Sequence, residues 1–135
     1  MALYQSTITN EQTAELPSAR FDGHIIVIER EDQIENMCRD LSAQSIIGFD
    51  TETRPSFKRG RSHKVALLQI ATTDTCFLFR LNQIGMPAFL QDFLMGDTLK
   101  IGLSLKDDFM MLRRRKDVHA EEGNWIELQD YVGRF

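Results

Sequence analysis

Five apolar runs rich in β-branched and aromatic residues constrain the fold more than any other feature of this sequence. They occupy 24–29, 45–52, 64–73, 75–81 and 98–104. Runs of this composition and length favour strands. A short turn at Thr73-Asp74 separates two of them. The sequence therefore predicts five strands, of which the second, third and fourth follow one another without a helix.

Three other segments repeat their apolar residues with the period of a helix. They are 31–44, 86–97 and 105–115. In the second, Pro87 suits a first turn and Gly96 a helix stop. Consecutive strands followed by alternating helices and strands predict an α/β fold, with helices packed on a mixed sheet.

The two ends of the chain differ from this central pattern. Residues 1–20 are polar without a clear period, so we expect a tail or arm before a domain that spans 21–135. The last segment, 124–135, begins a further element and carries apolar residues that nothing later in the sequence would cover.

Length and composition exclude several classes of protein. A chain of 135 residues is one domain at most, and a net charge of −4 argues against a globally basic nucleic-acid coat. Cys38 and Cys76 lie in apolar patterns and suit a reducing compartment better than a disulfide framework. The sequence has no secretory signal pattern and no long apolar run. We expect a soluble cytoplasmic protein without a membrane partner.

Positive charge is concentrated in two places despite the negative total. One group is the run Arg113–Lys116, and the other is Arg54, Lys58, Arg59, Arg61, His63 and Lys64. Either group can be a solvated surface, or can bind phosphate through its local field. The run at 113–116 also suits a helix C-terminus. The three histidines, His24, His63 and His119, have no metal-ligand spacing.

Two acids at the end of a predicted strand are the first candidate for chemistry. Asp50 and Glu52 are two residues apart, so their side chains point to the same side of a strand. They are either exposed acids in water, or ligands of a cation that removes their mutual repulsion. Oxygen ligands without histidine fit Mg²⁺ or Mn²⁺ better than zinc.

A third acid favours the second interpretation. Asp108 has Leu105, Met111 and Leu112 as neighbours on the predicted helix, so it lies near the inward face and needs a partner. Asp107 beside it can instead be a first-turn acid that favours the helix dipole. Three acids near a basic loop suggest two-metal phosphoryl chemistry on a phosphodiester.

These residues also carry a resemblance to a known family. "GFDTE" followed by a basic loop, "KVALLQIATTDTCFLF", "KIGLSLKDDFMMLRR" and "NWIELQD" occur in the order and spacing of the Werner-type 3′–5′ exonuclease domain. This domain belongs to the ribonuclease D and DnaQ-like (DEDD) group, which has a ribonuclease H-like fold. The similarity runs from about residue 24 to the C-terminus.

The resemblance implies a role for each acid. Asp50 and Glu52 match the first motif and would bind the first metal, while Asp50 would also touch the second. Asp108, six residues after Gly102, matches the second motif and would hold the second ion through water. The 3′-terminal nucleotide would lie across the loop after Glu52. The candidate nucleic-acid contacts are Thr51, Thr53, Arg59 and Lys64.

One departure from the family pattern limits the expected activity. The third motif, Tyr-x-x-x-Asp, has no match, because Tyr4 is followed four residues later by Ile8, and Tyr131 by Phe135. Asp130 lies before the expected place of this motif. We therefore expect a truncated domain that lacks its C-terminal helices, is inactive or weakly active alone, and can self-associate through uncovered surface.

Two functions remain open from the sequence. The first is a metal-dependent 3′–5′ exonuclease that removes nucleotides from 3′ ends, with DNA favoured over RNA by the similarity to the Werner type. The second is an exonuclease-like module that binds nucleic acid or a partner without cutting.

Overall fold

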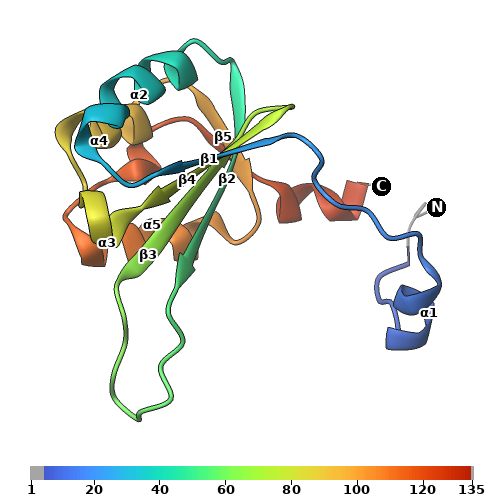
Figure 1. Cartoon of the computed structure of the whole chain (residues 1–135). Coiled ribbons are helices and arrows are strands. Elements are labelled where there is room, and N and C mark those ends of the chain that lie inside the picture. Colours follow the sequence, from blue (N-terminus) through green and yellow to red (C-terminus); the bar gives the residue numbers. More distant parts are fainter. Residues whose placement is uncertain (1–4, 135) are drawn as a thin grey trace.

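The computed structural model describes residues 5–134, which form one mixed six-stranded sheet with helices against it (Figure 1). The strands are β1 (His24–Ile28), β2 (Ile46–Thr53), β3 (Val65–Ala71), β4 (Thr75–Arg80), β5 (Leu99–Gly102) and β6 (Trp125–Glu127). Their order is β1-β4-β3-β2-β5-β6. The pairs β2–β3 and β3–β4 are antiparallel, and the other three are parallel. The α/β class and all five predicted strands are confirmed, and β6 begins the predicted last element.

The three predicted helices are also present. They are α2 (Ile34–Ser42), α4 (Ala88–Met95) and α5 (Leu105–Arg115). Pro87 and Gly96 are the caps of α4. The sequence did not predict α1 (Asn10–Glu15), α3 (Leu81–Ile84), or the 3₁₀ segments η1 (Glu31–Gln33), η2 (Ala120–Glu122) and η3 (Leu128–Arg134).

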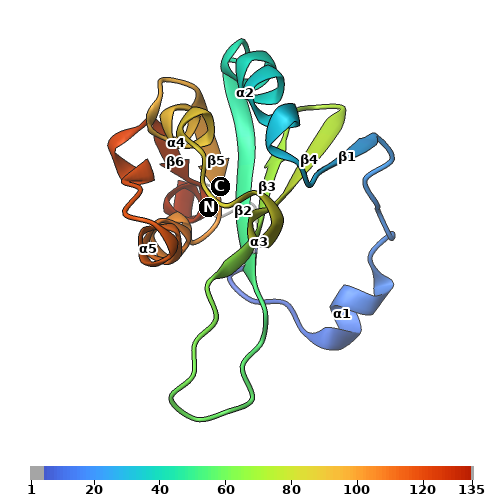
Figure 2. The same cartoon turned by 60° about the vertical axis from the view of Figure 1, so that its left-hand side comes forward.

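Helix α1 forms inside the segment that was expected to be a polar tail. Its cause is local: the Thr9 hydroxyl accepts from the backbone N–H of Gln12, and the Gln12 side chain accepts from that of Thr9. The helix buries no residue and stands apart from the sheet (Figure 2). Residues 5–20 therefore form an arm with a short helix in it.

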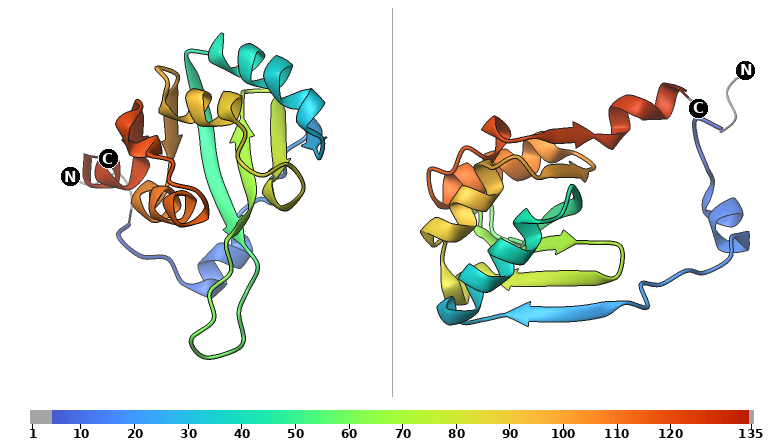
Figure 3. Two further views of the ribbon diagram at one scale, coloured as in Figure 1. Left: turned by 90° about the vertical axis from the view of Figure 1, so that its left-hand side faces the viewer. Right: turned by 90° about the horizontal axis from the view of Figure 1, so that it is seen from above.

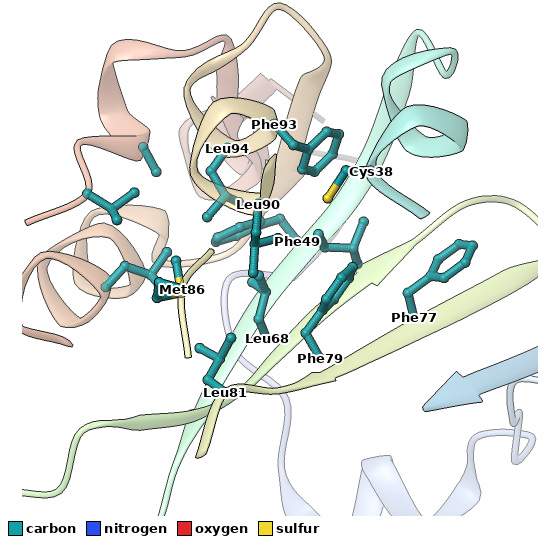
Figure 4. Close-up of a cluster of buried hydrophobic side chains, with 14 of the residues drawn as sticks. Cys38, Phe49, Leu68, Phe77, Phe79, Leu81, Met86, Leu90, Phe93 and Leu94 are labelled. Carbon is teal, nitrogen blue, oxygen red and sulfur yellow. The ribbon is translucent and has the colours of Figure 1, made fainter. Parts of the chain in front are cut away.

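The hydrophobic core lies on one face of the sheet. Helices α2, α4 and α5 all lie on that face (Figure 3). Alternate residues of the central strands point into it, and Figure 4 shows Phe49, Leu68 and Phe79 meeting Leu90 and Leu94 of α4. The residues between them on the strands are half-buried or exposed. The period of two therefore separates a covered face from an open one.

The open face carries exposed apolar side chains on the edge strand β1. Ile25 is 61% exposed and Val27 is 43% exposed.

No helix within residues 5–134 is long and apolar enough to cross a membrane.

Two adjacent leucines of β3 test this one-sided core. Leu68 is fully buried, whereas Leu67 points to the open face. We expect Leu68→Ala to lower the free energy of unfolding by about 2–5 kcal/mol, because it leaves a cavity. Leu67→Ala is the matched control and should cost about 1 kcal/mol. Urea unfolding of both variants measures the difference, and equal losses would contradict the assignment of faces.

Candidate active site

Strand β2 separates its functional side chains onto the two faces of the sheet. Phe49 points to the covered face, where its ring centroid lies 5.8 Å from that of Phe109 on α5. Thr51 shares this face. Asp50 and Glu52 share the other, open face, as their spacing predicted, and both are exposed. The side-chain amide of Gln69, opposite Asp50 on β3, donates to Asp50 Oδ2 at 3.3 Å.

The acids lie where β2 loses one neighbouring strand. Strand β5 pairs with β2 only as far as Gly48, opposite Ile101, so the chain turns away from β2 just before Asp50. Gly102 itself lies so close to β2 that a Cβ there would be 2.5 Å from the carbonyl oxygen of Phe49, so this position requires glycine. This close approach brings the start of α5 beside the acid-bearing part of β2.

Asp108 is the buried acid of this region. It is only 8% exposed, and its Oδ1 accepts a hydrogen bond of 2.5 Å from the Thr51 hydroxyl. Its Oδ2 is buried without a hydrogen-bond partner among residues 5–134. Burial and the negative charge of Asp50 together raise the pKa of Asp108 to about 6, against the opposing effect of the Thr51 hydrogen bond. The prediction of an inward-facing Asp108 is confirmed.

Glu127 fixes the helix that carries Asp108. It is the last residue of β6, and its two carboxylate oxygens accept from the backbone N–H groups of Ser104 at 3.0 Å and Leu105 at 2.8 Å. Ser104, the N-cap of α5, has a left-handed φ of 58° that costs a non-glycine residue free energy. Glu127 offsets this cost and satisfies two amides that the helix leaves unpaired. These hydrogen bonds lower the pKa of Glu127.

The donor atoms here fit a hard divalent cation in chemistry, although they are not gathered in a closed cage. In the described part of the chain, no three Asp, Glu, His or Cys side chains lie close enough together to hold a metal ion. The structure brings Asp108 to Thr51 and into the field of Asp50, while Glu52 lies beside Asp50 on the open face. The partnerless Asp108 Oδ2 and the like charge of Asp50 are what a bound cation would satisfy.

The remaining predicted contacts lie at or beyond the end of β2. Thr53 is the last residue of the strand, and Arg59 and Lys64 are exposed in the loop that joins β2 to β3. This loop extends away from the sheet (Figure 1). Thr51 has a different environment, because it is half-buried and its hydroxyl binds Asp108.

Comparison with known proteins identifies the family to which this arrangement belongs. The family model described as 3′–5′ exonuclease matches residues 25–132. The chain belongs to the 3′–5′ exonuclease family. It is 28% identical over 122 residues to the bifunctional 3′–5′ exonuclease/ATP-dependent helicase WRN of Mus musculus. This match covers 85% of the chain and 9% of WRN. It is 29% identical over 109 residues to a 3′–5′ exonuclease of Arabidopsis thaliana, covering 71% of this chain and 38% of that protein.

Solved structures agree with this assignment. The EXD2 exonuclease domain soaked in Mg and GMP has a TM-score of 0.68 and 26% identity, and the match covers 83% of this chain and 60% of that one. The Nibbler EXO domain of Aedes aegypti has a TM-score of 0.70 at 23% identity. This match covers 89% of the chain described here and 62% of the Nibbler domain, and it supports the fold alone. The EXD2 domain has also been soaked in Mn. This member of the family thus spans about 60% of these domain structures and less than half of the curated relatives named above.

Sequence reasoning missed two residues that organise the site. Gln69 is one alternating polar residue within an apolar strand, and only the β2–β3 register places it opposite Asp50. Glu127 is separated from Ser104 by 23 residues. The one local signal was the acid at the end of the apolar pair Trp125-Ile126.

Loss of Glu127 should loosen the start of α5. We expect Glu127→Ala to lower the melting temperature and to speed hydrogen exchange at the amides of Ser104 and Leu105, with a smaller effect for Glu127→Gln. A carboxylate with a lowered pKa stabilises the fold above its ordinary pKa, and this stability is lost as the pH falls through the lowered value. The difference from the wild type should therefore vanish in acid. Glu122→Ala, which removes an exposed acid, is the control. An equal effect of this substitution would contradict the role of Glu127 in holding the start of α5.

Removal of the buried charge should stabilise the protein. Asp108 has a pKa raised to about 6, so it destabilises the fold once it ionises. In metal-free buffer we expect Asp108→Asn to be more stable than the wild type by roughly 3 kcal/mol at pH 7, at 1.36 kcal/mol per pKa unit. The gain should grow between pH 4 and 6 and then stay constant.

The exposed neighbour Asp107 provides the control for this measurement. Asp107→Asn changes the same charge without removing a buried group, so its stability should keep nearly the same dependence on pH as that of the wild type. Urea unfolding across the pH range compares the three proteins. If Asp108→Asn gained no stability at neutral pH, this would show that the ionised carboxylate of Asp108 does not destabilise the fold.

Proposed function

We propose that this chain acts as a metal-dependent 3′–5′ exonuclease domain that hydrolyses phosphodiester bonds at 3′ ends, with DNA favoured over RNA. The observation that carries this proposal is the buried, partnerless Asp108 Oδ2 beside Asp50, in a chain of the 3′–5′ exonuclease family. An unpaired buried oxygen on a charged group is costly, and such groups cluster at functional sites.

The chain's own residues would prepare the site as follows. Asp50, Glu52 and Asp108 would hold Mg²⁺ or Mn²⁺, two ions in a complete site. Gln69 orients Asp50 through its amide, and Thr51 fixes Asp108 through its hydroxyl. When bound, the ions would supply Lewis-acid chemistry that activates the attacking water and stabilises the leaving oxygen.

The proposed substrate contacts lie on and after the end of β2. Thr53, Arg59 and Lys64 would contact the phosphates and sugar of the terminal nucleotides, because cations and hydroxyls on an exposed loop can reach a strand backbone. Thr51 contributes through Asp108, since its hydroxyl already donates to that carboxylate.

We expect the hydrolysis by residues 1–135 alone to be weak. The resemblance implies a Tyr and a fourth acid in a third motif, and this sequence has no Tyr-x-x-x-Asp. Loss of a ligand and of a water-positioning group lowers the rate by orders of magnitude. The same absence favours the second candidate, a module that binds nucleic acid without cutting it.

The setting we propose is the cytoplasm, with self-association as an added property. Cys38 and Cys76 are both free thiols, which suits a reducing compartment. The edge strand β1 carries exposed Ile25 and Val27, and an unpaired apolar edge can bind a second copy of the chain. Analytical sedimentation at several concentrations would detect such a dimer.

Asp50→Asn should abolish nucleolytic activity. With Mn²⁺ and 5′-labelled strands of DNA and RNA, we expect slow shortening from the 3′ end by the wild type and none by Asp50→Asn. Calorimetric titration with Mn²⁺ gives a second readout, in which Asp50→Asn should bind at least about tenfold more weakly. Asp107→Asn should behave as the wild type in both assays. If the wild type neither cuts nor binds Mn²⁺ but still binds the strands, the exonuclease proposal is wrong and the binding module is favoured.

A further inference from the structure

A positively charged pocket lies at the base of the β2–β3 loop, outside the group of acids. It has a volume of about 400 Å³. Its lining residues are Arg54, His63, Lys64, Ala66, Asn82 and Arg115. Three of these are permanent cations at neutral pH, and no carboxylate is among them. They come from both ends of the loop, from the start of β3, from α3, and from the last turn of α5.

Arg115 is the fixed part of this pocket. Its guanidinium is half-buried and donates to the carbonyl oxygen of Val65 at 2.7 Å, to Asn82 Oδ1 at 3.1 Å, and to the carbonyl oxygen of Leu81. These bonds use three of the five N–H groups of the guanidinium, so two remain for a ligand. Because the bonds hold the planar group in one orientation, an anion would meet a prepared donor.

The cations of the pocket form no ion pair within the described chain. Among residues 5–134, no ion pair within 4.0 Å involves Arg54, Lys64 or Arg115. Arg113, two residues before Arg115, is paired with Glu121. Burial lowers the pKa of Arg115. A concave site lined by unpaired cations attracts anions.

The pocket is aligned with the acids along one helix. Arg115 follows Asp108 by seven residues, so both lie on the same face of α5, about 10 Å apart along its axis. Asp108 contacts Thr51 of β2, and Arg115 contacts Val65, which pairs with Thr53. The line from acid to pocket thus runs along the end of β2. A stacked strand advances 3.4 Å per nucleotide, so 10 Å corresponds to about three nucleotides.

We propose that this pocket binds a phosphate group of the nucleic-acid strand, two to three nucleotides from the 3′ end. The inference rests on the proposed function, because the 3′ end is taken to lie at Asp50. Arg115 provides the oriented donors, while Arg54 and Lys64 close over the phosphate from the two ends of the loop. The same chemistry would accept free inorganic phosphate, which the test must separate from a strand phosphate.

The test uses the double variant Arg54→Gln/Lys64→Gln. Both side chains are exposed, and Arg115 with its carbonyl contacts stays in place, so the fold should be unaffected. The control is Arg30→Gln/Arg39→Gln, which removes the same charge from exposed ion pairs elsewhere. Affinity is measured in EDTA, where no hydrolysis occurs, with 5′-labelled single strands that each carry one neutral methylphosphonate linkage at a different distance from the 3′ end.

We expect the wild type and the control to lose about tenfold in affinity when the neutral linkage is two or three nucleotides from the end. The double variant should bind the unmodified strand more weakly than the wild type does, and the neutral linkage should not change its affinity further. In a plot of log K against the logarithm of the salt concentration, the slope for the double variant should be less negative by about 0.7, because one phosphate contact is lost. Inorganic phosphate, titrated separately, should bind the wild type more tightly than the double variant.

Two results would overturn the inference. If the affinity of the double variant depends on the position of the neutral linkage in the same way as that of the wild type, the pocket does not contact the strand. If phosphate binding differs between the two proteins but no linkage stands out, the pocket takes only the free anion. Because the measurement needs no cleavage, it is independent of the Asp50→Asn result. A linkage effect in a chain that neither cuts nor binds Mn²⁺ would keep the pocket and remove the exonuclease, and cleavage without a linkage effect would do the reverse.

Discussion

The hydrogen bond between the Thr51 hydroxyl and Asp108 joins the two segments on which the site depends. Thr51 belongs to the strand that carries Asp50 and Glu52, and Asp108 belongs to the first turn of α5. The bond can form only because Gly102 lets the chain pass close to β2, and because Glu127 holds the start of the helix. Distant parts of the sequence thus fix the position of one carboxylate.

The period of two in β2 gives this strand two separate tasks. Phe49 and Thr51 face the helices, where they build the core and hold α5. Asp50 and Glu52 face the open side, where solvent and ligands can reach them. The same strand therefore stabilises the fold with one face and presents charge with the other. A shift of one residue in its register would bury both acids and expose the aromatic core.

The sequence predicted the strands and the main helices because their signals are local. Apolar runs rich in β-branched and aromatic residues marked the five predicted strands, and the neighbours of Asp108 indicated its inward direction. Short elements escaped: α1 depends on one capping box, and α3 has only four residues. The contacts of Gln69, Glu127 and Arg115 cross from one element to another, so they follow from the sheet register and helix placement. Local composition contains no such information.

A net charge of −4 is a poor guide to what this molecule can bind, because its charges are unevenly compensated. Arg30, Arg39, Arg80 and Arg113 each have an acidic partner in the described chain. The cations around the β2–β3 loop form no ion pair there, so their side chains are free to contact a ligand. At physiological salt the Debye length is about 8 Å, so a strand near the loop is affected by these cations more than by acids far from it. Local pairing, more than the sum of charges, therefore decides where a polyanion can approach an acidic protein.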